Sequence, residues 1–442
     1  MNIQLSDHFT YGKLMRFTIS SIIMMIFTSI YGVVDGLFVS NFVGKTPFAA
    51  INFIYPFIGV LGAVGFMLGT GGSALVAMKL GESKKEDANK LFSLFVYVSI
   101  VAGIVIAVLG IVLVRPIASL MGADGELLEN CVLYGRIILM VLPVFMLQME
   151  FQSFFITAEK PQLGLAVTIA SGVTNMVLDW LFMAVFQFGL AGAALATAFS
   201  QIVGGLLPIF YFSRKNTSLL RLTKTRFDGK ALLKACTNGS SELMSNVSMS
   251  LVSMLYNIQL MKYAGEDGVS AYGVLMYVSF VFISIFIGYS IGTAPIFGFH
   301  YGAGNYEELK SLFKKSLVII SIFSLCMVVL ANVMSTPLSH IFVGYDEVLF
   351  EMTKRGFFIY SFSFLFCGIA IFGSSFFTAL GDGLTSALMS FLRTLVFQII
   401  AVLLFPLIWG IDGIWISIVI AEFMACVVTI FFFIRKRKKY HY

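Results

Sequence analysis

The chain of 442 residues is 59% hydrophobic and only 12% charged. Soluble proteins carry roughly 25% charged residues, so this composition excludes a soluble enzyme, a disordered chain and a disulfide-rich secreted domain. The net charge of +6 would suit nucleic acid on a soluble domain, but here the basic residues lie in short segments between apolar stretches. That distribution is typical of membrane topology, so we predict an integral membrane protein that binds no nucleic acid.

Twelve apolar stretches are long enough to form membrane-spanning helices, which need about 20 residues each. The first stretch follows Lys13 and Arg16 and is too long for a signal peptide. The predicted spans are residues 14–40, 48–78, 91–114, 132–158, 162–185, 189–213, 231–262, 270–300, 312–334, 356–380, 385–408 and 411–434. The predicted fold class is therefore an all-α integral membrane protein with twelve transmembrane helices.

Twelve spans place both ends of the chain on the same side of the membrane. Most of the 29 Lys and Arg residues lie in segments on this side. The opposite loops contain only Lys45, Arg115, Lys262, Lys354 and Arg355. Because cytoplasmic loops are enriched in Lys and Arg, we predict a multi-pass protein of the cell membrane with both termini in the cytoplasm.

The sequence repeats weakly at half its length. Residues that match across 221 positions include Pro116 and Pro337, Gly135 and Gly356, and Gly189 and Gly410. Each half has six spans, so the halves have the same orientation, an arrangement found in transporters. We predict an N-lobe of residues 1–213, a cytoplasmic linker of residues 214–230 and a C-lobe of residues 231–442.

Ionisable side chains within the bilayer cost roughly 2.5 to 3.5 kcal/mol each and mark functional sites. At about 1.5 Å per residue, Asp35 in the first span, Asp179 in the fifth and Thr197 in the sixth lie at a similar depth in the outer half of the membrane. Asn175 precedes Asp179 by four residues, so the two side chains share one helix face. If these helices are neighbours, their side chains form a cage of oxygen ligands.

Such a cage suits a monovalent hard cation, by analogy with other oxygen-ligated ions. It also suits a proton, because two close carboxylates in a low dielectric cannot both be ionised. The alternative interpretation is that Asp35 and Asp179 only bond to local backbone. The histidines lack metal-ligand spacing, so no metal centre is predicted. We expect Glu150 and Glu422 to be paired or hydrogen-bonded near the cytoplasmic ends, with Arg393 a candidate partner.

Three stretches carry a resemblance to a known family. They are YGVVDGLFVSNFVG around Asp35, NMVLDWLF around Asn175 and Asp179, and GLAGAALATAFS through Thr197. With twelve spans and two lobes, the chain resembles the multidrug and toxic compound extrusion (MATE) family over essentially its whole length. The resemblance implies a V-shaped pair of six-helix bundles that exports organic cations against an inward flow of sodium ions or protons. It implies a transporter without a cofactor, not an enzyme, and we expect a monomer.

The resemblance also implies roles for particular residues. In the branch with an acidic cluster in the N-lobe, the cation site matches Asp35, Asn175, Asp179 and Thr197, with the carbonyl of Ala193 as a further ligand.

The first helix departs from the family pattern, and further residues outside the cation site also bear on the mechanism. Many members have a proline in the first helix, where this chain reads RFTISSII with Ser20 and Ser21, so coupling here is not expected to use a proline bend. Glu242 is a possible second acidic site. The C-lobe counterparts of Asp35 and Asp179 fall near Tyr256 and Ile400, which predicts one driving site, in the N-lobe.

The preferred functional hypothesis is a cation-coupled multidrug antiporter that works by alternating access. No G-x-x-x-x-G-K-[ST] phosphate loop is present in the sequence, so ATP is not expected to drive it. The alternative is a flippase for lipid-linked oligosaccharides or lipids with a related architecture, which would need buried cationic residues to hold a pyrophosphate. A sensory or scaffold protein would leave the buried carboxylates unexplained.

Overall fold

The computed structural model describes residues 3–344 and 346–442, and this part of the chain contains helices and no strands. The N-terminal half forms α1 (Tyr11–Phe42), α2 (Lys45–Gly81), α3 (Lys85–Leu120), α4 (Gly125–Met140), α5 (Leu142–Thr157), α6 (Pro161–Asp179), the π-helical segment η1 (Trp180–Val185) and α7 (Gly189–Ser213). The C-terminal half forms α8 (Gly229–Gly302), α9 (Tyr306–Val343), α10 (Glu347–Ser361), α11 (Phe364–Ala379), α12 (Gly383–Phe391), the π-helical η2 (Leu392–Val396), α13 (Phe397–Leu404) and α14 (Pro406–Tyr440).

The number of spans agrees with the sequence prediction. Among the described residues, nine helices are long and apolar enough to cross a membrane, or up to eleven when each bent pair is counted as one span. The 74 residues of α8 would form a straight rod of about 111 Å, far longer than a bilayer of about 30 Å. Gly265 interrupts α8 with a non-helical φ of 63°, so α8 contributes two spans and the total is twelve.

The backbone of the two halves repeats as the sequence does. Glycines with positive φ occur at Gly44 and Gly265, and again at Gly189 and Gly410; within each pair the two residues lie 221 positions apart. Glycine is favoured at these breaks because it has no Cβ to clash in the left-handed region. The repeat predicted from weak sequence matches is therefore also present in the chain geometry.

One span of each half is bent, which the sequence analysis did not predict. The angle is 60° between α4 and α5 and 51° between α10 and α11. Pro143 lies in the first turn of α5, where its ring disfavours continuation of the preceding helix. The second bend lies at Phe362 and Ser363 and has no proline. Because it falls at the matching position of the repeat, a proline cannot be the common cause of both bends.

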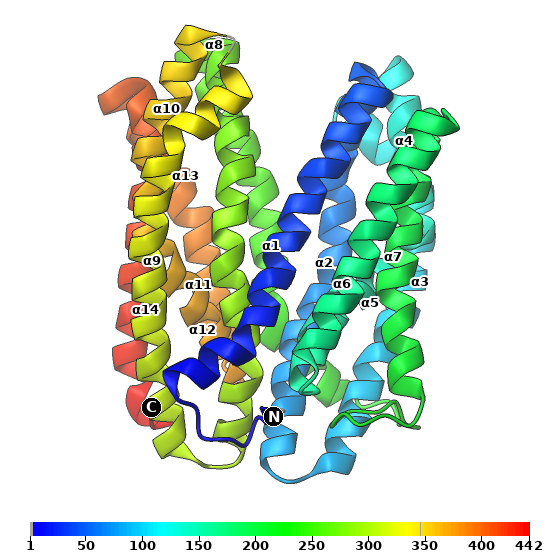
Figure 1. Ribbon diagram of the computed structural model, residues 1–442, viewed down its shortest axis with the longest axis vertical. Coiled ribbons are helices and arrows are strands. Elements are labelled where there is room, and N and C mark those ends of the chain that lie inside the picture. Colours follow the sequence, from blue (N-terminus) through cyan, green and yellow to red (C-terminus); the bar gives the residue numbers. More distant parts are fainter. Residues whose placement is uncertain (1–2, 345) are drawn as a thin grey trace.

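The helices are arranged as two bundles, an N-lobe of α1 to α7 and a C-lobe of α8 to α14 (Figure 1). The bundles meet at the end of the molecule that holds both chain termini, here called the terminal end, and diverge toward the opposite end (Figure 1). This V shape agrees with the expectation from the family resemblance.

Backbone contacts between α2 and α8 hold the lobes together near the terminal end. A Cβ added at Gly71 would lie 2.1 Å from the carbonyl oxygen of Ala235, and one added at Gly239 would lie 1.9 Å from that of Met67. Real Cβ atoms do not approach backbone oxygens so closely, so both positions require glycine. Small residues of this kind allow close helix packing in membranes.

A segment before α1, residues 3–10, connects the two lobes and is here called the N-terminal strap. The backbone N–H of Leu5 donates to Oε1 of Glu159 in the N-lobe at 2.6 Å. The N–H of Phe9 donates to Oε1 of Glu308 in the C-lobe at 2.9 Å, and Nδ1 of His8 lies 2.6 Å from its Oε2. Leu5 and Phe9 are fully buried, so the strap fastens the terminal end through both lobes.

We expect Glu308→Ala to weaken the attachment of the N-terminal strap to the C-lobe. The change leaves the buried N–H of Phe9 without its acceptor, which costs about 1 to 3 kcal/mol. The apparent unfolding temperature in detergent should fall by several degrees. Glu307→Ala is the matched control, because Glu307 is the exposed neighbour on the same turn. An equal unfolding temperature for both variants would show that the strap does not contribute.

The segment predicted as a linker is non-helical from residue 214 to 228 and lies at the terminal end (Figure 1). Part of it is bound to α3. The N–H of Arg221 donates to Oδ1 of Asn89 and the N–H of Thr223 donates to Oγ of Ser93, both at 2.8 Å. The connection between the lobes is therefore attached to the N-lobe along part of its length.

Candidate cation site

The structure brings the predicted N-lobe residues together because α1, α6 and α7 are neighbours. The carboxyl group of Asp35 on α1 lies within interaction distance of the Asp179 carboxyl and the Asn175 amide, both on α6. Asp179 is the last residue of α6, and the π-helical η1 begins at the next residue. Single π-helical turns of this kind are frequent at functional sites.

Asn175 and Asp179 are buried and Asp35 is half-buried, and all three have unused hydrogen-bonding capacity. Asn175 is 1% exposed and Asp179 is fully buried. Among the described residues, no hydrogen bond is formed by Oδ1 of Asp35, by either oxygen of Asp179, or by either polar atom of the Asn175 amide. Most buried polar atoms in proteins are paired. A cluster of unpaired carboxylate and amide oxygens has the chemistry to accept a hard cation or a proton.

Thr197 on α7 completes this group, which we call the N-lobe cluster: Asp35, Asn175, Asp179 and Thr197. Its Oγ1 is likewise buried and has no partner among the described residues. Ala193 lies one helical turn earlier on α7 and is 1% exposed. It packs in a small apolar cluster with Val39 and Met183, so α1 and η1 enclose the site on this side.

Tyr134 on α4 belongs to the same environment, and the sequence analysis missed it. Its side chain lies beside Thr197 and within electrostatic range of Asp35 and Asp179, and it is only 3% exposed. A tyrosine in an apolar span is common, so its type carries little signal. In the sequence, only the position of Tyr134 near the start of the fourth span gives it a membrane depth similar to that of the N-lobe cluster.

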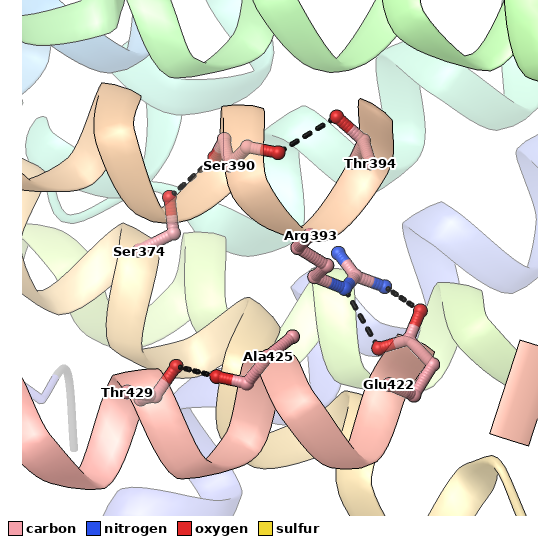
Figure 2. Close-up of polar contacts among 7 residues, drawn as sticks. All are labelled: Ser374, Ser390, Arg393, Thr394, Glu422, Ala425 and Thr429. Carbon is pink, nitrogen blue, oxygen red and sulfur yellow. Dashed lines mark hydrogen bonds and ion pairs between the residues drawn. The ribbon is translucent and has the colours of Figure 1, made fainter. Parts of the chain in front are cut away.

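Glu242, predicted as a possible second acidic site, lies in the first part of α8 and therefore in the other lobe. It is within electrostatic range of Arg393. Arg393 makes two hydrogen bonds to Glu422, Nε to Oε2 at 2.8 Å and a second nitrogen to Oε1 at 3.0 Å (Figure 2). The predicted pairing of Glu422 with Arg393 is confirmed, but Glu422 lies in the middle of α14 and not near a helix end.

The corresponding prediction for Glu150 is wrong. Its side chain on α5 is fully buried, and neither carboxyl oxygen has a hydrogen-bond partner in the described part of the chain. The Cα of Glu150 packs against Gly69, where an added Cβ would lie 2.8 Å away. The neighbour of the Glu150 carboxyl is the hydroxyl of Ser99 on α3, and no hydrogen bond or basic partner for this carboxyl is found among the described residues.

The C-lobe counterpart of Asp35 is neutral and satisfied. The hydroxyl of Tyr256 donates to Oε1 of Gln398 at 2.7 Å. Its ring stacks on Tyr272 with centroids 5.4 Å apart. Elsewhere in the C-lobe, the hydroxyls of Ser374, Ser390 and Thr394 are also hydrogen-bonded (Figure 2). The two lobes therefore share a fold but differ in the electrostatics of the equivalent position.

The region of α1 where the family resemblance led us to expect a proline forms uninterrupted helix from Tyr11 to Phe42. Oγ of Ser21 donates to the carbonyl of Thr18 at 2.8 Å, a local bond that bends helices slightly. Ser21 also contacts the C-lobe, because a Cβ added at Gly292 would lie 2.3 Å from its Oγ. This part of α1 is thus packed between the lobes.

Two six-helix bundles with a parallel repeat and one buried acidic cluster define a membrane transporter. The model of the MatE family matches the chain twice, over residues 20–181 and 243–404. The chain therefore belongs to the MATE family, whose members are transporters and not enzymes. The two matches fall in the two halves of the repeat.

Similar proteins cover nearly the whole chain. The multidrug export protein MepA of Staphylococcus haemolyticus is 26% identical over 95% of this chain and 92% of its own length. MepA of Staphylococcus aureus strain MRSA252 is 24% identical over 93% and 91%. Among solved structures, a multidrug resistance MATE transporter in an outward-facing conformation matches with a TM-score of 0.93 at 23% identity, covering 99% of this chain and 98% of that one.

Proposed function

We propose that this protein exports organic, mostly lipophilic cations from the cell in exchange for protons or sodium ions. The observation that carries the proposal is the N-lobe cluster, in which the buried oxygens of two neighbouring carboxylates lack partners. The names of the MepA relatives support export of multiple drugs. The coupling ion is cargo that the cluster would bind and release during each cycle.

The arrangement of the lobes supports alternating access. The bundles diverge at the end opposite to both termini (Figure 1). With the termini in the cytoplasm, as the basic loops predict, this is an outward-facing state. A cation entering from outside would reduce the negative charge of Asp35 and Asp179 and favour release of a positively charged drug. The lobes would then close at the outer end and open at the terminal end, so that the cation is released to the cytoplasm.

The energetics depend on how many cations accompany each drug. Exchange of one cation for one monovalent drug moves no net charge, so only the concentration gradients contribute, about 1.4 kcal/mol for each pH unit in the proton case. A second cation moves one net charge and adds about 2.3 kcal/mol per 100 mV. The paired carboxylates of the N-lobe cluster make either stoichiometry chemically possible.

The aromatic and methionine content of the chain supports the substrate class. The chain contains 46 Phe and 22 Met. Aromatic faces attract organic cations through cation-π contacts, and methionine side chains adapt to ligands of different shape.

Purified protein in lipid vesicles tests the proposal. Ethidium movement should follow an imposed pH gradient or an imposed sodium gradient, and should stop when that gradient is collapsed by an ionophore. Protein-free vesicles with the same gradients are the control. Ethidium movement that is independent of both gradients would contradict cation coupling, and no movement of any organic cation would contradict the export function.

The flippase alternative finds no comparable support. A pyrophosphate needs uncompensated positive charge, whereas Arg393, a buried cation of the C-lobe, is held by both oxygens of Glu422. The N-lobe cluster is acidic and would repel a phosphate group.

A further inference from the structure

The buried face of α6 consists of glycines and polar side chains. Its buried residues are Gly164, Thr168, Ser171, Gly172, Asn175 and Asp179, and none has an aliphatic side chain. They recur at intervals of three or four residues, so they form one stripe along the helix. The stripe descends about 22 Å, at about 1.5 Å per residue, from the N-lobe cluster to the first turn of α6 at the terminal end.

Hydrogen bonds link the N-lobe cluster to the middle of this stripe. Oγ of Ser200 on α7 donates to the carbonyl of Thr197 at 2.8 Å. Oγ of Ser171 donates to the carbonyl of Ser200 at 2.7 Å, and Nε2 of Gln148 on α5 donates to Oγ of Ser171 at 3.1 Å. Three helices thus contribute polar groups to one continuous row inside the N-lobe.

Unpaired oxygens continue the row toward the terminal end. Gln148 is 7% exposed and Gln152, one turn further along α5, is 5% exposed. Neither Oε1 atom has a partner among the described residues. An unpaired buried acceptor is costly, so its retention at two successive turns of a membrane helix indicates a function.

Both glutamines line a small cavity. Its other lining residues are Gly164, Thr168 and Gly204 and the apolar Phe151, Phe155 and Val167. The cavity leaves about 10 Å³ for the centres of water-sized molecules, roughly the room for one water. Gly204 keeps this space open, since an added Cβ would lie 2.6 Å from the amide carbon of Gln148. The cavity can accept a water molecule or a small cation, but it is far too small for an organic drug.

We propose that this row is the path by which the coupling cation passes between the N-lobe cluster and the terminal end, inside the N-lobe and separate from the drug. The inference deepens the proposed function and rests on it. Neutral hydroxyl and amide oxygens can relay a proton through water, or coordinate a sodium ion in steps. The drug is too large for the row and must move between the lobes.

Gln148→Leu and Gln152→Leu test the path, since each removes an oxygen while keeping most of the side-chain volume. Gradient-driven ethidium export should fall by about tenfold in each, the loss expected from one missing oxygen contact. Ethidium affinity in detergent, and its displacement by the cation at the N-lobe cluster, should remain as in wild type. Gln162→Leu, on an exposed position of α6, is the matched control.

Two further comparisons keep the result interpretable. Thr168→Val is nearly isosteric and should reproduce the defect if a leucine variant fails to fold. Imposed pH and sodium gradients, applied separately, identify whether a proton or a sodium ion uses the row. If the wild type shows gradient-driven export and all three variants export ethidium at the same rate, the proposed path is wrong while the proposed function stands. Loss of ethidium affinity along with export would also overturn it, since the row would then belong to the drug site.

Discussion

Asp179→Asn and Asp35→Asn are each expected to abolish gradient-driven export of ethidium while the protein remains folded and inserted. Asparagine has nearly the same shape as aspartate but carries no charge and cannot exchange a proton. The two carboxyl groups lie within interaction distance, and Asp179 is fully buried. Removal of either charge should therefore disable binding of the coupling cation, with export reduced to the rate of protein-free vesicles.

Asp124→Asn is the matched control for this experiment, because Asp124 is an exposed residue before α4 in the same lobe. Abundance in the membrane and the elution volume in detergent should match wild type for all three variants. If both cluster variants export ethidium at the wild-type rate, the N-lobe cluster is not the coupling site. Export lost in Asp124→Asn as well would point to a general defect.

The second large effect is expected for Gly239→Val. A Cβ at this position would lie 1.9 Å from the carbonyl oxygen of Met67, and a backbone oxygen cannot rotate away as a side chain can. Overpacking typically costs about 1 to 3 kcal/mol or more. The lobes should be forced apart at the terminal end, so the expected result is loss of export together with a lower unfolding temperature.

Gly273→Val provides the control on the same long helix. An ideal Cβ at Gly273 meets no atom within 4 Å, so the same added volume should leave both export and the unfolding temperature unchanged. Normal export in Gly239→Val would show that the close contact between α2 and α8 is not needed during the cycle. Equal losses in both variants would assign the effect to valine in a helix and not to the lobe contact.

Sequence reasoning reached the N-lobe cluster because its signals are local. A carboxylate in an apolar span stands out by its cost in the bilayer, and its depth follows from the constant rise of a helix. The assignment that Asp35 meets Asp179 needed one further condition, that α1 lies beside α6. In the structure α1 does lie beside α6, as the family resemblance implied.

The same reasoning failed for Glu150 and missed Tyr134, for a common physical reason. Whether a buried carboxyl finds a cation depends on which helix faces it, and that is a property of packing between distant segments. Glu422 faces Arg393 (Figure 2), whereas the Glu150 carboxyl lies near the neutral hydroxyl of Ser99 on α3. No feature of the sequence near either glutamate distinguishes these outcomes.

The amino-acid sequence by itself determined the twelve spans, their orientation preference and the twofold repeat, because hydrophobicity, charge and glycine placement act within each segment. The tertiary structure decided the bends of α4–α5 and α10–α11, the strap that joins Glu159 to Glu308, and the polar row beneath the N-lobe cluster. The strap and the polar row depend on hydrogen bonds between residues far apart in the chain, which only the packed helices bring together, and the bend between α10 and α11 has no proline to mark it in the sequence.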